Sequence, residues 1–358
     1  MNNLKKIGLT ALASSLVAVS VNAGEMGVSG SFTTTYVTHD GNTVTDANNG
    51  GIGIGNNAAL SFTGSGELDN GWTFAGNTAL TDTNTISSNA LSLTMGSMGT
   101  LKVGTGHGGA SGLYDAQTPA AYEEVDDGGA TASSANAIGN FLDNNAIMYT
   151  APTLEFEGTT VTFTAEYSPE ANDVSTADGS NSTASTTWGS GKSLGVTLAN
   201  YGATFGAYAA ERTHDGTQTA AVGEGPQAGD ASEMVAYLNY AYGPVSVGYS
   251  MSHLDSGTNA TAVAKASTKV IRTANLFTSE TYSIAFNVND DLSVSYAVLD
   301  DKHDAGDDSV TATTKSYQAA YSMGSMSIKG AHTKSDNVGY HEFGGSRTRN
   351  EIALGLAF

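Results

Sequence analysis

The sequence of 358 residues contains no cysteine, only 5 prolines and few charged residues. The absence of cysteine excludes disulfide scaffolds, Cys-ligated zinc, iron–sulfur clusters and cysteine nucleophiles. Charged residues make up 14% of the chain, against roughly 25% in an ordinary soluble domain. The 14 basic residues are outnumbered by 35 acidic ones, which gives a formal net charge of −21. This balance argues against a nucleic-acid partner, because phosphate binding requires Lys and Arg.

Residues 1–23 have the features of a secretory signal peptide. A basic Lys5-Lys6 pair precedes an apolar stretch from Ile7 to Val21. Val21-Asn22-Ala23 then supplies the small residues that precede a cleavage site. We therefore expect a mature domain of residues 24–358. No later stretch reaches about 18 consecutive apolar residues, so no transmembrane helix is predicted.

Alternation of large apolar and small polar residues dominates the rest of the sequence. In Leu292-Ser293-Val294-Ser295-Tyr296-Ala297-Val298, every second residue is large and apolar. The same alternation recurs at 161–167, 245–252, 282–288, 326–329 and 352–358. A period of two with one apolar face is typical of β-strands. No segment shows the 3.6-residue periodicity of an amphipathic helix.

The connections between the predicted strands alternate in length. Tight turns rich in Gly, Asn, Asp and Pro occur at 67–71, 96–99, 151–158, 199–202, 243–244, 289–291 and 324–325. Longer polar stretches lie near 39–57, 81–88, 105–143, 168–190, 213–232, 254–280, 300–314 and 334–348. Together these connections join about 16 strands, and short turns at one end with long loops at the other are typical of outer-membrane barrels.

A transmembrane β-barrel also explains the composition. Its large apolar residues face lipid and the alternate residues line a polar lumen, which accounts for the many Ser, Thr, Gly, Ala and Asn residues. Closure of the sheet satisfies every backbone amide within hydrocarbon. The alternative is a secreted soluble β-sandwich or β-solenoid, whose apolar faces would meet in a core. We predict an all-β fold, a closed antiparallel transmembrane barrel of about 16 strands.

Three stretches carry motifs that resemble those of one family. Met98–Gly104 contains the pattern G-x-L-x-x-G, and Asn144–Pro152 is similar to R-N-S-[IV]-x-Y-x-S-P. The last strand alternates apolar residues up to its end, at Ile352, Leu354, Leu356 and Phe358. In this order, the stretches resemble the general diffusion porins of Gram-negative outer membranes. In that family they are the strands before and after the third loop and the signal for the barrel-assembly machinery.

The resemblance implies a homotrimer of sixteen-stranded barrels, each with its long third loop folded into the lumen. In this sequence the loop would span residues 105–143. It contains no Lys or Arg and six acids, Asp115, Glu123, Glu124, Asp126, Asp127 and Asp143. In the family such acids face an arginine cluster on the barrel wall. Here the wall from Met26 to Val103 has Lys102 as its single basic residue, and Asn144 stands where the family has Arg.

An acidic constriction raises the local concentration of cations and repels anions, since a low-dielectric passage focuses the field. The sequence therefore predicts a water-filled, cation-preferring channel for passive diffusion of small hydrophilic solutes and ions. It predicts no enzymatic activity. Lys102, Lys192 and Lys329 are the candidate counter-charges on the wall. Outer-membrane lipid and lipopolysaccharide are the expected surroundings.

Two alternatives within the barrel class remain. A substrate-selective porin would carry a ladder of inward aromatic and Arg side chains. A structural or adhesive surface barrel with a plugged lumen would carry large or paired lumen residues.

Other ligand signals in the sequence are weak. Gly104–Gly109 matches the dinucleotide fingerprint G-x-G-x-x-G, but Gly112 and Pro119 argue against the helix that must follow it. The seven histidines lack metal-binding spacing, so no metal centre is predicted. The acidic stretch Asp300–Asp308 lacks the register of a Ca²⁺ loop, although its oxygens could hold Ca²⁺ loosely. No other cofactor is expected.

Overall fold

The computed structural model describes eleven parts of the chain. They are residues 24–41, 50–80, 86–115, 117–127, 138, 141–171, 188–214, 229–259, 274–305, 308–340 and 345–358. The predicted signal peptide lies outside these residues, as do parts of each predicted long loop. Within these parts, no helix is long and apolar enough to cross a membrane.

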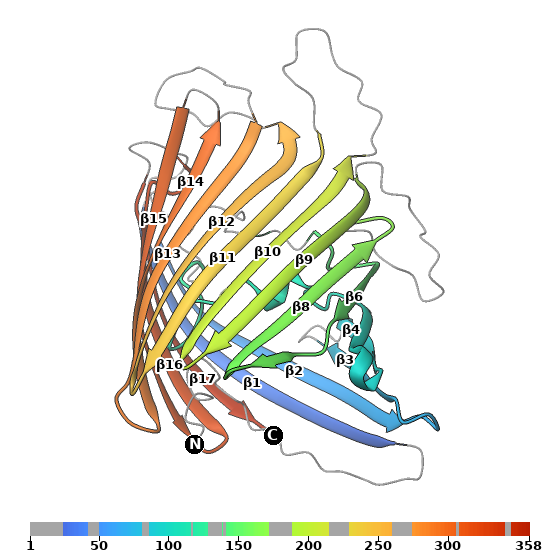
Figure 1. The fold of residues 1–358 in the computed structure, drawn as a ribbon. Coiled ribbons are helices and arrows are strands. Elements are labelled where there is room, and N and C mark those ends of the chain that lie inside the picture. Colours follow the sequence, from blue (N-terminus) through green and yellow to red (C-terminus); the bar gives the residue numbers. More distant parts are fainter. Residues whose placement is uncertain are drawn as a thin grey trace.

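Almost all regular structure in these residues is antiparallel sheet (Figure 1). The strands are β1 (Glu25–Gly41), β2 (Gly51–Glu67), β3 (Thr73–Leu80), β4 (Ile86–Thr94), β5 (Thr100–Thr105), β6 (Ala146–Thr150), β7 (Leu154–Phe156), β8 (Thr159–Ser168), β9 (Trp188–Asn200), β10 (Ala203–His214), β11 (Ala231–Tyr242), β12 (Val245–Asn259), β13 (Ala274–Asn287), β14 (Leu292–Ala305), β15 (Asp308–Met323), β16 (Met326–Asp336) and β17 (Arg347–Ala357). Two 3₁₀ helices, η1 (Gly96–Met98) and η2 (Ser111–Leu113), flank β5.

The sheet closes because its first and last strands pair. β1 and β17 are antiparallel from Ser31↔Ala357 to Gly41↔Arg347. β6 and β7 both pair with β8 and form two halves of one wall strand, which is interrupted at Pro152 because proline has no backbone N–H to donate. The wall therefore has 16 strands, and the predicted closed antiparallel barrel is confirmed.

The tight turns lie where the sequence predicts them, with left-handed glycines such as Gly71, Gly243 and Gly324. The predicted long loop at 300–314 is wrong. β14 and β15 continue through it and stay paired as far as Ala305↔Asp308. The sequence hides these strand ends because polar residues occupy both faces there, so the apolar alternation stops before the pairing does.

Side chains alternate between an exposed apolar outer face and a covered inner face. On β13, Tyr282, Ile284 and Phe286 are 40–49% exposed, whereas Ser283 and Ala285 between them are 9% and 4% exposed. Large apolar side chains on the outside are stable only if hydrocarbon surrounds them. The outer face therefore has the pattern of a membrane barrel rather than that of a soluble sandwich.

Phe358 secures the junction between the two ends of the sheet. Its backbone N–H and C=O each pair with Gly30 at 3.0 Å, and its ring lies 5.7 Å from that of Phe32. A Cβ on Gly30 would approach Phe358 Cζ to 2.5 Å, so glycine leaves the space that the ring fills. The preceding alternate residues Ile352, Leu354 and Leu356 are exposed on the outer face.

Candidate functional site

A glycine-rich turn begins the segment that leaves the wall after β5. The three glycines within Gly106–Gly109 have φ values of +61°, +75° and +55°, a conformation that turns backbone N–H groups into an anion-binding nest. The N–H of Gly108 donates to Asp143 Oδ1 at 2.5 Å, and that of Ala110 donates to Glu166 Oε2 at 3.1 Å. Carboxylates of the chain itself fill the nest, which explains the dinucleotide-like pattern without a nucleotide.

Tyr114 fixes the next part of the segment to the inner face of the wall. Its hydroxyl lies 3.0 Å from Thr164 Oγ1 on β8, and its ring stacks on Tyr208 of β10 with centroids 5.4 Å apart. Gly195 of β9 leaves the space for this ring, since a Cβ there would collide with it. The segment is therefore anchored across three neighbouring strands.

Residues 117–127, here called the loop tip, follow the inner face of the wall further round the barrel. Asn239 Nδ2 on β11 donates to the carbonyl of Gln117 at 2.5 Å. The N–H of Ala121 donates to Ser295 Oγ on β14 at 2.9 Å. These contacts carry the loop tip well away from β5 and β6, the strands that flank the long loop (Figure 1).

Gln318 on β15 binds two consecutive residues of the loop tip. Its Oε1 accepts from the N–H groups of Tyr122 and Glu123 at 2.9 and 3.2 Å, and its Nε2 donates to the carbonyl of Glu123 at 2.7 Å. The side-chain amide thus acts as a strand peptide group would. Gln318 is buried, so losing these bonds would leave buried groups unpaired at a cost of about 1–3 kcal/mol each.

Arg349 on β17 lies between acids of the loop tip and of the wall. Its Nη1 is 3.2 Å from Glu123 Oε1 and 3.2 Å from the carbonyl oxygen of Asp127, and its Nη2 pairs with Glu351. The hydroxyl of Tyr122 donates to Glu351 Oε1 at 2.5 Å. The side chains of Arg349, Glu123 and Glu351 are only 16%, 12% and 3% exposed. The last strand thus supplies a wall arginine opposite the loop acids.

The remaining acids of the loop tip gather beside this cluster. Carboxylate oxygens of Glu124, Asp126 and Asp127 lie within 4.8 Å of one another. In the part of the chain that the structure describes, no other three acidic or histidine side chains approach so closely. Asp115 lines a small cavity together with Glu124 and Asp126. Asp143 instead holds the start of the segment through Gly108.

Burial and mutual repulsion change the titration of these acids. Burial raises the pKa of Glu124 to about 8, and the neighbouring Asp115 acts in the same direction. Burial likewise raises the pKa of Asp126 to about 7. Burial raises the pKa of Glu123 to about 7, although the Arg349 guanidinium opposes this shift. These three carboxyls therefore change charge near neutral pH.

A cavity of about 940 Å³ adjoins the loop tip at the short-turn end of the barrel. Glu123, Glu124 and Asp127 border it from the loop. The wall contributes mainly polar or small residues, among them Thr160, Asn200, Thr204, Asn239 and Ser246. The acids thus border a largely polar cavity inside the barrel.

Two of the three predicted counter-charges lie on the inner face. Lys329 on β16 places its Nζ 5.1 Å from the ring centre of Tyr122. Lys102 on β5 points to the face opposite Val103, which is exposed on the outside, and pairs in register with the buried Met148. Of these two lysines, Lys329 lies at the loop tip.

The prediction for Lys192 is wrong. Lys192 lies on the outer face, where it forms an ion pair of 2.9 Å with Glu211. Its neighbour Ser193 is buried and Leu194 is 69% exposed, so Lys192 belongs to the outward set. Lys192 and Leu194 are two residues apart on one strand and so point to the same face. This spacing in the sequence was sufficient to predict that Lys192 points outward.

The predicted set of site residues lacks four inner-face residues, namely Arg212, Gln318, Arg349 and Glu351. Arg349 and Glu351 are out of phase with the outward Ile352 and Leu354, so their phase could have placed them on the inner face. Arg212 lies between the rings of Phe141 and Trp188, 4.0 and 3.8 Å from their centres. No pattern in the sequence predicts which loop groups these side chains bind.

The described acids of β14 in the stretch near residue 300 lie on both faces of the wall. Asp301 points inward and accepts hydrogen bonds from Ser279 and Tyr340. Asp304 lies in register on the other face and pairs with Lys302. Asp301 and Asp304 therefore could not bind the same cation, and a loose Ca²⁺ site formed by other acids of this stretch is not tested by these contacts.

Comparison with known proteins identifies the family. A family model described as Gram-negative porin matches residues 8–358. The chain belongs to the Gram-negative porin family. The porin is therefore an integral β-barrel of the outer membrane that forms a channel, and it is not an enzyme.

Solved structures with the same fold include three porins or outer-membrane proteins. Salmonella typhi OmpF in complex with daunomycin has 13% identity and a TM-score of 0.63, covering 95% of this chain and 100% of that chain. An anion-selective porin from Comamonas acidovorans has 14% identity and a TM-score of 0.63, covering 94% and 100%. OmpT of Vibrio cholerae has 12% identity and a TM-score of 0.55, covering 95% and 100%. A search of curated protein sequences gives no match.

Proposed function

We propose that this porin is a passive diffusion channel for small hydrophilic solutes and ions, and that it prefers cations. The observation that supports the preference is the group of loop-tip acids: Glu124, Asp126 and Asp127 cluster within 4.8 Å, and Glu123, Glu124 and Asp127 border the cavity of about 940 Å³. Arg349 pairs with Glu123 of this group. Acids in excess over bases at a narrow, low-dielectric passage attract cations.

In this proposal residues 105–143 form the constriction. The contacts of Tyr114 on β8 and β10, of Ala121 on β14 and of Glu123 on β15 and β17 support it. A loop bound to inner-face residues of so many strands reduces the open cross-section of the barrel. An anion-selective porin shares the fold, so the fold alone does not determine whether cations or anions are preferred. In this proposal the charges of the loop determine it.

Purified porin in planar bilayers is expected to give a steady ohmic conductance. In a KCl gradient, the reversal potential should indicate K⁺ permeability at least about fivefold above that of Cl⁻, because one unit charge at 4 Å contributes about 1 kcal/mol even in water, attracting K⁺ and repelling Cl⁻. A reversal potential of the opposite sign would contradict the cation preference while leaving the channel intact. The absence of conductance would contradict passive diffusion and support the plugged alternative.

The cation preference is expected to rise with pH between about 6 and 9. Protonated carboxyls are neutral, and the pKa values near 7 for Glu123 and Asp126 and near 8 for Glu124 place their ionisation in this interval. Reversal potentials measured from pH 5 to pH 9 should approach unselective values at the acidic end. In the Glu124→Gln variant the change above about pH 7.5 should be lost. A constant selectivity across the whole range would show that these acids do not control it.

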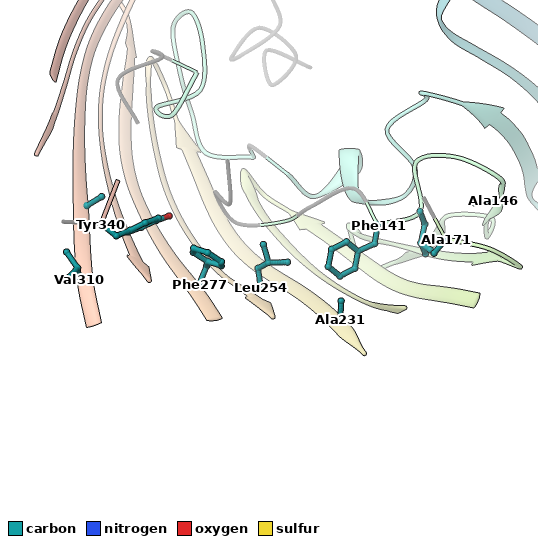
Figure 2. Close-up of a cluster of buried hydrophobic side chains, with 10 residues drawn as sticks. Phe141, Ala146, Ala171, Ala231, Leu254, Phe277, Val310 and Tyr340 are labelled. Atoms are coloured by element: carbon teal, nitrogen blue, oxygen red, sulfur yellow. The ribbon is translucent and has the colours of Figure 1, made fainter. Parts of the chain in front are cut away.

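The substrate-selective alternative requires aromatic side chains that passing solutes can touch. Phe141, Leu254, Phe277 and Tyr340 lie in a row across the inside of neighbouring strands near the long-loop end (Figure 2). They are 3–9% exposed, because they pack against one another and against other parts of the chain. They therefore do not offer a track of accessible rings.

The remaining parts of the proposal concern export and surroundings. Residues 1–23 would be removed as a signal peptide, and the last strand with Ile352, Leu354, Leu356 and Phe358 would be recognised by the barrel-assembly machinery. We expect a homotrimer; one OmpT structure from Vibrio cholerae is described as a trimer form. The exposed apolar outer face fits contact with lipid and lipopolysaccharide. A loosely bound Ca²⁺ stays a prediction.

A further inference from the structure

The inner face of β14 binds two different parts of the chain, one above the other. In order toward the long-loop end, its inner-face residues are Ser295, Ala297, Leu299, Asp301 and His303. The first three contact the loop tip through Ala121 and Val125. The last two contact Tyr340, which belongs to the connection between β16 and β17. A second segment thus lies inside the barrel, nearer the long-loop end than the loop tip.

Tyr340 is bound to the wall through its hydroxyl and its ring. The hydroxyl donates to Asp301 Oδ2 at 2.6 Å, while Ser279 Oγ donates to the other carboxylate oxygen at 2.9 Å. The ring centre lies 5.6 Å from that of Phe277 and 5.1 Å from that of His303. Figure 2 shows Tyr340 beside Phe277 on the inside of the curved wall. Tyr340 is 7% and Asp301 3% exposed, so water competes little for this hydrogen bond.

The residues next to Tyr340 adopt a tight and specific conformation. Asn337 and Tyr340 both have φ of +56°. Asn adopts this conformation readily, but it is rare for a residue as bulky as Tyr and persists only where surrounding contacts outweigh the strain. Asn337 Nδ2 donates to the carbonyl of Thr311 on β15 at 2.9 Å, and the Tyr340 N–H closes a turn onto the Asn337 carbonyl at 3.0 Å. Val338 is 4% exposed. The strained turn is therefore held against β13, β14 and β15.

We propose that residues 337–340, here called the mouth segment, form a second constriction in series with the loop tip, and that Tyr340 on Asp301 is the latch that holds it inward. This inference rests on the proposed passive diffusion function. The mouth segment occupies lumen space that would otherwise be open above the loop tip. None of its residues Asn337, Val338, Gly339 and Tyr340 is charged, so it selects solutes by size rather than by charge. Tyr340 is accordingly a positioning residue.

The test compares Tyr340→Ala, Tyr340→Phe and the control Tyr317→Ala. Tyr317 is a tyrosine of the outer face, 56% exposed, and its truncation leaves the lumen unchanged. Tyr340→Ala should raise single-channel conductance by about 1.5-fold or more, because pore diameter sets conductance. In liposome swelling with neutral sugars of increasing size, it should accelerate the largest sugar most. Tyr340→Phe should give a smaller effect on both the conductance and the size limit.

The rate of thiol labelling in the mouth segment tests the latch independently of conductance. The chain has no cysteine, so Val338→Cys is a unique thiol. It should react slowly with a bulky water-soluble thiol reagent in the otherwise wild-type porin and at least about tenfold faster when combined with Tyr340→Ala, since exposure controls thiol access.

Equal labelling rates in the two backgrounds would overturn the latch. Wild-type conductance and size limit in the folded Tyr340→Ala variant would overturn the second constriction. If the wild-type porin itself does not conduct, the proposed function fails instead, which is a distinguishable result.

Discussion

Replacing three acids of the loop tip together, in the variant Glu124→Gln/Asp126→Asn/Asp127→Asn, is expected to remove most of the cation preference. Their carboxylate oxygens lie within 4.8 Å of one another, so a passing cation meets their combined field. A single unit charge at 4 Å contributes about 1 kcal/mol in water, or about a fivefold change in local ion concentration, and more in a low-dielectric passage. Reversal potentials in a salt gradient at about pH 9, where the raised pKa values of Glu124 and Asp126 still leave both carboxyls ionised, measure the change, which should bring the K⁺/Cl⁻ permeability ratio close to one.

The matched control removes the same number of acids from the outer face, in Glu211→Gln/Glu280→Gln/Asp300→Asn. These residues lie outside the lumen in strand register, so the control changes net charge equally without changing the field in the passage. Its selectivity should match that of the wild type. If both triple variants lose selectivity to the same extent, overall charge and not the loop tip determines the preference.

The variant Arg349→Met is expected to release the loop tip from β17. Arg349 bridges Glu123 and Glu351, and removing one partner of a buried charge cluster costs about 3–5 kcal/mol because the other charges stay buried and unpaired. Single-channel records should show frequent transitions between conductance levels where the wild type is steady. The open level should be more cation-selective than the wild type, since the opposing positive charge is gone.

Two further variants distinguish the bridge from a general effect of the arginine. Arg349→Lys keeps the charge but loses the planar fork that binds two carboxylates, so its records should be intermediate. Arg347→Met removes the next inward arginine, which forms no ion pair with the loop tip within the described residues. Steady wild-type currents in Arg349→Met would show that Gln318 and the other contacts hold the loop tip without the bridge.

Most of the barrel could be predicted from the sequence because local patterns of a few residues determine where its strands and turns lie. Period-two alternation, as in Leu292–Val298, reports which face meets hydrocarbon, and turn residues such as Gly243-Pro244 report where strands reverse. The same logic could have placed Arg349, Glu351 and Lys192 from their phase relative to Leu354 and Leu194. The prediction failed at residues 300–314, because the alternation of apolar and polar residues ends before the strand pairing does.

The site could be predicted only as a set of acids on a long loop. Their positions depend on tertiary contacts that have no sequence signature, such as the amide of Gln318 binding the backbone of Glu123. The raised pKa values of Glu124 and Asp126 depend on burial, which no residue spacing reports. The role of Asp143 in filling the glycine nest likewise appears only once the two ends of the loop are brought together.

The pairing of β1 with β17 has a consequence for biogenesis. It joins Ser31 to Ala357, residues from the first and last strands of the barrel, and the entropic cost of closing a loop grows with its length. Until β1 and β17 pair, two strand edges carry free amides and carbonyls that hydrocarbon cannot solvate. A polypeptide without its final strand would therefore keep an open edge that hydrocarbon cannot solvate, rather than form a smaller pore.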